Sequence, residues 1–221
     1  MCIRDRYINN TMTKLALNGG DPIRTKPFPQ WPRPTSDLKD AIIDTLENEG
    51  WGVGSRSVSR FEEKFAKFHD AKYCISTSSG TTALWIILKA AGVKAGDEVI
   101  VPPYTFIATA SAVLMANAVP IFVDIDSSTF NIDANLIEAA ITEKTKAILP
   151  VHYTGKICDM EAIGDIANEY GLLVIEDAAQ AFGAKSRYVI AGSFGKVACF
   201  SMNAMKVLHS YGEAGVVVTD D

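Results

Sequence analysis

Apolar runs alternate with helix-like stretches along most of the chain, which is typical of a parallel sheet covered by helices on both faces. The predicted strands are 73–76, 98–101, 120–124, 147–151, 172–175, 197–200 and 215–219. The predicted helices are 37–49, 57–69, 83–91, 105–116, 133–141 and 159–170. The pattern therefore predicts an α/β fold with three layers, αβα, and a mostly parallel sheet.

The N-terminal part of the chain lacks this pattern. Residues 1–14 show no clear periodicity, and we expect them to be a disordered or artefactual extension with the natural start at Met12. Residues 15–35 are rich in Gly and Pro, which predicts a segment that wraps over a surface. Residues 36–221 then form the large domain, with a break in the helical pattern at 51–54. Because the chain stops directly after an apolar strand, we expect this domain to be truncated at its C-terminal end.

Composition narrows the class of protein. Hydrophobic residues make up 48% of the 221 residues and charged residues 21%, as in ordinary globular domains. The net charge of −5 argues against nucleic acid or an anionic membrane as partner. Membrane-spanning runs of about 20 apolar residues and a secretion leader are absent, so we expect a cytoplasmic protein. Four scattered cysteines without a Cys-x-x-Cys spacing indicate reduced thiols and no metal site.

The most informative stretch is 172–180, where an apolar run ends in Glu176 and Asp177. A carboxylate at the end of a buried strand is desolvated and needs a cation to stay ionised. Lys206 follows among apolar neighbours such as Phe200 and Met205, which argues against a fully solvated side chain. Such a pair suits a pyridoxal cofactor, although a structural Asp177 and a surface Lys206 remain open alternatives.

Two further stretches come at strand ends. Residues 76–82 combine hydroxyl side chains with one glycine before a helix, which suits either a phosphate cradle or an ordinary N-cap. Tyr104 and Phe106 follow the strand 98–101, where an aromatic ring either stacks on a planar cofactor or packs in the core. His152 and His209 stand at no zinc-ligand spacing, so we expect packing or substrate contact.

Taken together, these motifs resemble the DegT/DnrJ/EryC1/StrS sugar aminotransferases, pyridoxal-phosphate enzymes of the aspartate aminotransferase fold (type I). The resemblance runs from about Leu15 to Asp221, nearly the whole chain. The stretches that carry it are 79–84, 101–109, 123–126, 176–180, 200–201 with Lys206, and 212–215.

The resemblance implies a role for seven residues. Lys206 would form the Schiff base with pyridoxal 5'-phosphate and carry the proton, and Asp177 would pair with the pyridinium nitrogen. The other implied cofactor contacts are Gly80, Thr81 and Ser201 at the phosphate, Phe106 stacked on the ring, and Gln180 beside it.

The resemblance also implies a reaction and its partners. The family transfers an amino group from glutamate or glutamine to a keto group of a nucleotide-activated sugar or a cyclitol, and it works as homodimers. Its small C-terminal domain, which builds part of the substrate site, is missing from this chain. Val207 and Ala214 differ from the residues common in the family, and one additional residue lies between Lys206 and Gly212. We expect the changes beside the lysine to alter the subfamily or the substrate and not the cofactor.

Three alternatives compete with this reading. One is a non-catalytic regulatory or inert truncated member of the same fold. Another is a pyridoxal-phosphate sugar dehydratase, a branch in which histidine replaces the lysine and against which Lys206 argues. The third is a sugar oxidoreductase or dehydratase with a dinucleotide-binding fold, which requires a Gly-x-Gly-x-x-Gly that residues 76–82 lack.

Overall fold

The computed structural model describes residues 14–29, 31–49 and 54–221. The chain divides into two compact units, residues 1–40 and 41–221. The expected extension at 1–14 lies outside the described residues except for Lys14, and the expected break at 51–54 does so except for Gly54.

The first unit contains little regular structure. A short 3-10 helix, η2, spans Ala16–Asn18 and ends at Gly19, whose φ of 86° is a backbone conformation that glycine adopts freely. The segment 15–35 therefore holds one helical turn that the sequence did not predict, while its wrapping over a surface stays a prediction. Helix α1, Ser36–Asn48, begins in this unit and ends in the next.

The second unit is built on a seven-stranded sheet in the order β1-β9-β8-β5-β4-β2-β3. The strands are β1 Tyr73–Thr77, β2 Glu98–Val101, β3 Val119–Phe122, β4 Thr145–Ile148, β5 Leu173–Asp177, β8 Val197–Ser201 and β9 Gly215–Thr219. Strand β9 pairs antiparallel with both β1 and β8, and the other pairs are parallel. The mostly parallel sheet is thus confirmed, with β9 alone running against its neighbours.

Helices connect and cover these strands. They are α2 Arg56–Phe68, α3 Gly80–Ala90, α4 Ala108–Met115, α5 Ala134–Ile137 and α6 Met160–Tyr170, with the 3-10 turns η3 Glu138–Ala140 and η4 Tyr153–Gly155. Helix α4 begins three residues later than predicted, so Thr105 stays in the loop before it. A small hairpin of β6, Lys185–Ser186, and β7, Val189–Ile190, was not predicted.

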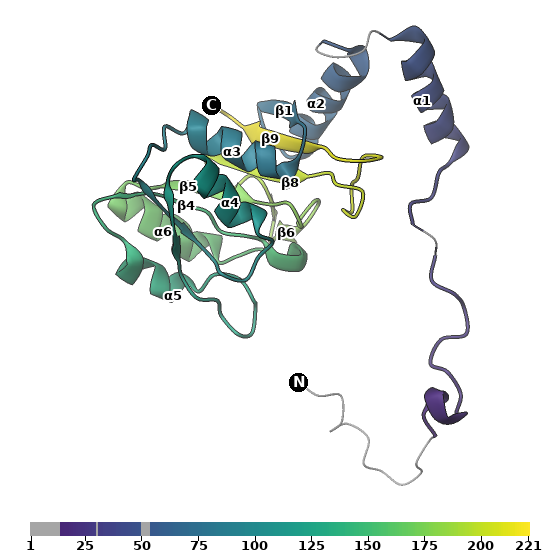
Figure 1. Ribbon diagram of the computed structural model, residues 1–221, viewed down its shortest axis with the longest axis horizontal. Coiled ribbons are helices and arrows are strands. Elements are labelled where there is room, and N and C mark those ends of the chain that lie inside the picture. The colour runs from purple at the N-terminus through teal and green to yellow at the C-terminus, as the bar shows by residue number, and fades with distance from the viewer. Residues whose placement is uncertain (1–13, 30, 50–53) are drawn as a thin grey trace. The chain divides into compact units, whose positions relative to one another are not determined.

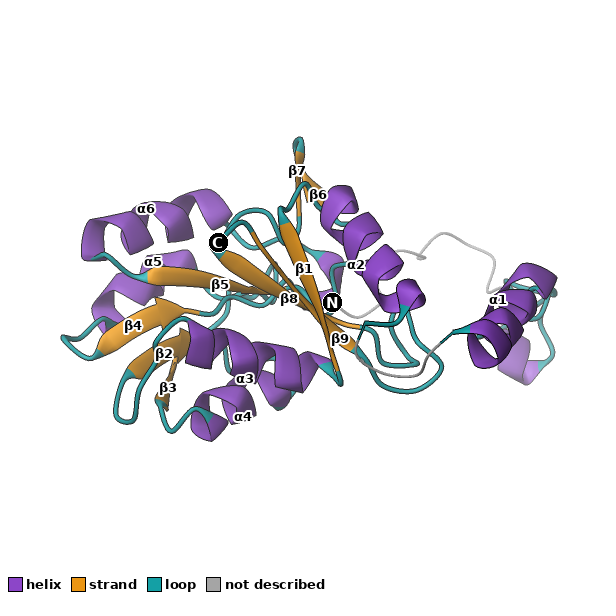
Figure 2. Cartoon of the chain, turned by 90° about the horizontal axis from the view of Figure 1, so that it is seen from above, coloured by secondary structure: helices purple, strands orange, loops and turns teal. Residues whose placement is uncertain are grey.

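Side chains that alternate along the central strands are buried on both faces of the sheet. Val99 and Val101 pack in one core with residues of α3 and α4, whereas Ile100 between them packs in another with residues of α5 and α6. Phe65 of α2 and Phe200 of β8 belong to a third core. Figures 1 and 2 show α3 and α4 on one side of the sheet and α6 on the other. The three-layer αβα prediction is therefore confirmed.

Parallel strands bring their carboxyl ends to one edge of the sheet, where α/β proteins bind ligands. Asp177 ends β5 and Ser201 ends β8, the strand beside it. Within the described ranges, the structure contains no helix of the length and apolar character that crossing a membrane requires.

Candidate active site

A cavity of about 510 Å³ opens at the carboxyl ends of β5 and β8, beside the start of α3. All seven residues that the sequence singled out line it, namely Gly80, Thr81, Phe106, Asp177, Gln180, Ser201 and Lys206. Four polar residues that were given no role also line it, namely Thr105, Thr109, Asn203 and Glu213. The structure thus brings together groups that lie up to 126 positions apart in the chain.

Asp177 is fixed at the floor of this cavity, with 4% of its surface exposed. Its Oδ2 accepts a hydrogen bond from Oγ1 of Thr109 at 2.8 Å, and its Oδ1 accepts one from the N–H of Ala179 at 3.1 Å. Burial raises the pKa of Asp177, while the two hydrogen bonds and the positive charge of Lys206 act in the opposite direction. Asp177 is therefore a desolvated carboxylate with donors on both oxygens, as the sequence pattern predicted.

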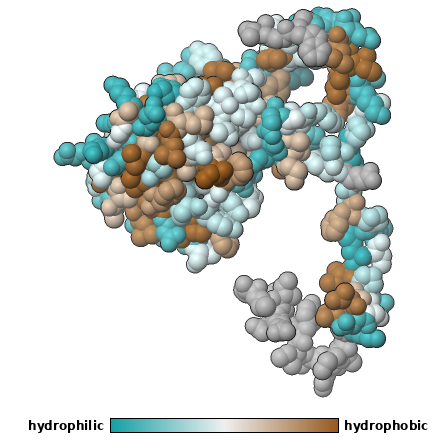
Figure 3. Space-filling model, viewed as in Figure 1, coloured by the Kyte–Doolittle hydropathy of each residue, from teal (hydrophilic) through white to brown (hydrophobic). Residues whose placement is uncertain are grey.

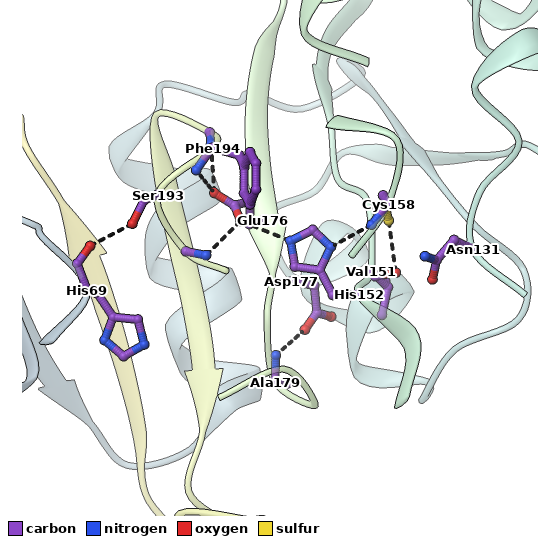
Figure 4. Close-up of polar contacts among 12 residues, drawn as sticks. His69, Asn131, Val151, His152, Cys158, Glu176, Asp177, Ala179, Ser193 and Phe194 are labelled. Atoms are coloured by element: carbon purple, nitrogen blue, oxygen red, sulfur yellow. Dashed lines mark hydrogen bonds and ion pairs between the residues drawn. The ribbon is translucent and has the colours of Figure 1, made fainter. Parts of the chain in front are cut away.

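The neighbouring residue, Glu176, points away from the cavity into a buried network (Figure 4). Its Oε2 bonds Nε2 of His152 at 2.9 Å and the N–H of Gly192 at 2.7 Å, and its Oε1 accepts from the N–H groups of Phe194 and Gly195 at 2.7 and 2.6 Å. Nδ1 of His152 accepts from the N–H of Cys158. This pattern makes Nε2 the protonated nitrogen, so His152 is a structural donor and not a ligand of the cavity.

The start of α3 forms a cradle of backbone N–H groups. Ser79 caps the helix by accepting from the N–H of Thr82, while Gly80 and Thr81 lie in the first turn, where a helix offers its own N–H groups no acceptor. A Cβ at Gly80 would lie 2.8 Å from Cβ of Ser201, and one at Gly215 would lie 2.4 Å from the backbone of Ser79. Only glycine permits this close approach of the helix to β8 and β9, which brings the Ser201 hydroxyl beside the N–H groups at the helix start, where an anion can bind.

Lys206 reaches the cavity from the loop 202–214, which joins β8 to β9. Its side chain is half-buried, and its backbone N–H donates to the carbonyl of Asn203 at 2.8 Å. The apolar neighbours that the sequence suggested behave differently from one another. Phe200 is 1% exposed, but Met205 and Val207 are 87% and 72% exposed, so the expectation of an enclosing apolar shell is wrong for these two.

The remaining two predicted residues, Phe106 and Gln180, line the sides of the cavity. Phe106 lies in the loop before α4 and exposes 68% of its surface, so it does not pack in the core. Oε1 of Gln180 accepts from the N–H of Thr154 in η4 at 3.0 Å. A second cavity of about 310 Å³ shares Gln180 and Lys206 with the first and is also lined by Thr154 and Val207. Lys206 therefore stands between two adjoining spaces.

Comparison with known proteins identifies the family. Residues 33–221 match the profile of the DegT/DnrJ/EryC1/StrS aminotransferase family. The chain belongs to this family. The resemblance seen in the sequence motifs is thereby confirmed.

Relatives within the aminotransferase family differ in their named roles. The chain is 43% identical to the L-glutamine:2-deoxy-scyllo-inosose aminotransferase of Streptomyces kanamyceticus, over 95% of this chain and 50% of that protein. It is 50% identical to a pleiotropic regulatory protein of Geobacillus stearothermophilus, over 81% of this chain and 48% of that protein. The chain spans about half the length of the curated relatives it matches.

A solved structure shares the fold of this chain. The crystal structure of NtdA from Bacillus subtilis with bound cofactor PMP matches with a TM-score of 0.77 and 41% identity, over 85% of this chain and 43% of that one.

Sequence reasoning missed the polar residues that surround Asp177. Thr105 and Thr109 lie four positions apart in one of the family motifs, a spacing that places two side chains on one face of a helix and that signals a paired role. Asn203 and Glu213 lie in the loop around Lys206, and a side-chain hydrogen bond joins them. Neither Asn203 nor Glu213 stands in a sequence pattern that indicates a role, because the path of the loop decides whether the two side chains meet.

Proposed function

We propose that this chain forms the cofactor-binding part of a pyridoxal-phosphate aminotransferase that aminates a keto group of a cyclitol or a nucleotide-activated sugar. The observation that carries the proposal is the arrangement of Asp177, Lys206 and the start of α3 around one cavity. Family membership supports the reaction type, and the Streptomyces relative, named for a glutamine donor and a cyclitol acceptor, supports the substrates.

The residues present fit the cofactor. The close approach of Gly80 to Ser201 leaves backbone N–H groups and a hydroxyl for a phosphate, and the buried carboxylate of Asp177 suits a protonated ring nitrogen. The solved relative NtdA, named with bound cofactor PMP, the amine form of pyridoxal phosphate, supports the same assignment. When bound, this cofactor supplies a reactive carbonyl carbon and an electron-withdrawing ring.

Each predicted residue then has a distinct task. Lys206 would anchor the cofactor covalently through Nζ and move a proton with the same atom. Asp177 would hold a proton on the ring nitrogen, while Phe106 would cover one face of the ring. Gly80, Thr81 and Ser201 would hold the phosphate, and Gln180 would hydrogen-bond the ring substituent nearest to η4.

A second candidate function is regulation without catalysis, which the pleiotropic regulatory relative favours. A protein released from catalysis has no need to keep a lysine and a buried carboxylate facing one cavity. The intact set of seven residues in this chain therefore favours the enzyme.

We also propose a homodimer in the cytoplasm. Exposed apolar side chains on and near α4 and β3, two elements in contact with each other, support association, since exposed apolar groups of this kind are typical of interaction surfaces. They are Phe106, Ile107, Leu114, Met115 and Phe122, and Figure 3 shows hydrophobic atoms exposed on the 41–221 unit. Three buried free cysteines, Cys74, Cys158 and Cys199, are consistent with a reducing compartment.

The test is a half-reaction. The full chain is loaded with pyridoxal phosphate, L-glutamine or L-glutamate is added, and the absorbance band of the bound cofactor is followed. We expect the band to decline with one donor, and a keto-cyclitol added next to restore it as an amino-cyclitol appears by mass spectrometry. A folded, loaded protein that reacts with neither amino acid would contradict the enzyme and favour regulation.

A further inference from the structure

Two threonine hydroxyls stand in line behind Asp177 at the start of α4. Thr109, with 1% of its surface exposed, places Oγ1 2.8 Å from Oδ2 of Asp177. Thr105, in the preceding loop and half-buried, places its Oγ1 2.9 Å from Oγ1 of Thr109. The three groups form a row that leads from the rim of the cavity to the carboxylate.

The chemistry of the groups fixes the direction of these hydrogen bonds. In its ionised form the Asp177 carboxyl only accepts hydrogen bonds, so in that form the hydrogen of the Thr109 hydroxyl points to Asp177. A hydroxyl carries one hydrogen, and therefore Thr105 must be the donor in its bond with Thr109. Successive donors polarise one another, which strengthens the bond that Asp177 receives.

The surroundings of Asp177 also affect the pKa of its carboxyl, in both directions. Burial raises the pKa of its carboxyl, and the hydrogen bonds from the Thr109 hydroxyl and the Ala179 N–H, together with the charge of Lys206, oppose this rise. Cys199 of β8 is the register neighbour of Asp177, and burial raises the pKa of its thiol well above the ordinary value, so the thiol stays neutral. Thr109 is thus the principal neutral donor to a carboxylate in a dry site.

We propose that Thr109, oriented by Thr105, is a positioning residue that keeps the Asp177 carboxylate ionised and turned toward the cofactor ring nitrogen. The expected effect on the cofactor rests on the proposed function, whereas the arrangement of the two hydroxyls does not depend on any cofactor. Thr109→Val keeps the side-chain shape and removes the donor, Thr109→Ser keeps the donor, and Thr105→Val removes only the hydroxyl behind it.

The experiment titrates Asp177 directly. In the full chain without cofactor, the ¹³Cγ resonance of Asp177 is followed against pH after labelling of aspartate, with Asp177→Asn to assign it. We expect Thr109→Val to move the titration midpoint upward, Thr105→Val to move it upward by less, and Thr109→Ser to leave it close to wild type. Thr145→Val is the matched control, because Thr145 is also buried, with 4% exposed, but its hydroxyl serves a turn at β4.

A second readout is the affinity for pyridoxal phosphate. Loss of the bond to a charged acceptor should weaken binding roughly tenfold in Thr109→Val, with recovery in Thr109→Ser. If wild type binds no cofactor, the proposed function fails while the titration still decides the role of Thr109.

The outcomes that overturn the proposal are also distinct. An unchanged Asp177 midpoint in a folded Thr109→Val protein would overturn it, and so would an equal shift in Thr145→Val. Should Thr109→Val not fold, the Thr105→Val protein decides, and a midpoint that matches wild type there would overturn the proposal.

Discussion

Asp177 and Lys206 face one cavity from two regions that are built in contrasting ways. Asp177 ends a central strand, exposes 4% of its surface and has donors on both carboxylate oxygens. Lys206 sits on a loop whose neighbouring side chains, Met205 and Val207, are 87% and 72% exposed. One region is fixed by buried contacts, and the other is open to solvent.

The loop is held mainly by its own backbone. The N–H of Met202 donates to the carbonyl of Ala214, that of Ala204 to Gly212, and that of Ser210 to Met202. The first two bonds continue the β8–β9 register beyond the sheet, and the third closes the loop onto Met202. The difference teaches that the carboxyl group is placed in the rigid core, whereas the lysine that we propose to form and break bonds with the cofactor is placed on an open loop.

The largest effect on stability is expected for Glu176 in the buried region, and Glu213 in the exposed loop serves as its comparison. Glu176→Ala leaves three backbone N–H groups and Nε2 of His152 without an acceptor, and we expect it to cost about 3–5 kcal/mol of unfolding free energy. Glu213→Ala in the exposed loop should stay within about 0.5 kcal/mol of wild type. Urea unfolding measures both, and similar losses for the pair would break the contrast.

The second-largest effect on stability is expected from alanine substitutions at two glycines, one in a crowded position and one in open space. A Cβ at Gly80 meets Cβ of Ser201 at 2.8 Å, so Gly80→Ala should cost about 1–3 kcal/mol and abolish tight cofactor binding. Gly164 in α6 has open space around it, so Gly164→Ala should stabilise the protein by about 0.5–1 kcal/mol. Thermal unfolding and cofactor titration compare the two, and normal cofactor affinity in Gly80→Ala would disprove the cradle.

A smaller effect is expected in the pH dependence of stability, because His69 is buried in the core. His69 is fully buried against Phe65 and Phe200, and burial lowers its pKa below the ordinary value of 6.5. The unfolded chain therefore binds a proton first as the pH falls, so stability should decrease below about pH 6.5 and level off below the folded-state pKa. His69→Phe should remove this part of the pH dependence. Parallel stability curves for the variant and wild type between pH 8 and 5 would contradict it.

The smallest effect on stability is expected at Lys206, the lysine that we propose to bind the cofactor. Lys206→Ala removes a half-buried side chain from the open loop, and the unfolding free energy should change by no more than about 0.5 kcal/mol. Covalent attachment of the cofactor should nevertheless disappear. A loss of several kcal/mol on urea unfolding would show that Lys206 belongs to the rigid framework instead.

Local patterns were sufficient to predict most of the fold. Apolar runs and helical periodicity located the seven strands of the main sheet, because each element buries its own side chains in the core. The antiparallel place of β9 between β1 and β8 was not predictable, since it depends on partners distant in sequence. The β6–β7 hairpin escaped prediction because two-residue strands are too short for any period.

The candidate site was also predictable from the sequence only in part. The position of Asp177 was predicted correctly, because a residue that ends a buried parallel strand lies at the carboxyl edge of the sheet. The exposure of Met205 and Val207 was missed because composition near Lys206 does not show the path of the loop. Thr109 was missed because its importance comes from a contact with a residue 68 positions away.

The central claim is that Lys206 and Asp177 together hold pyridoxal phosphate, and borohydride trapping tests it most directly. The full chain is incubated with the cofactor, reduced, digested and mapped by mass spectrometry, beside Lys206→Ala and the control Lys196→Ala, whose lysine pairs with Asp221 outside the cavity. The account predicts the added mass on the peptide that contains Lys206 in wild type and in Lys196→Ala, and none in Lys206→Ala. Attachment at another lysine, or no attachment to folded wild type, would contradict it.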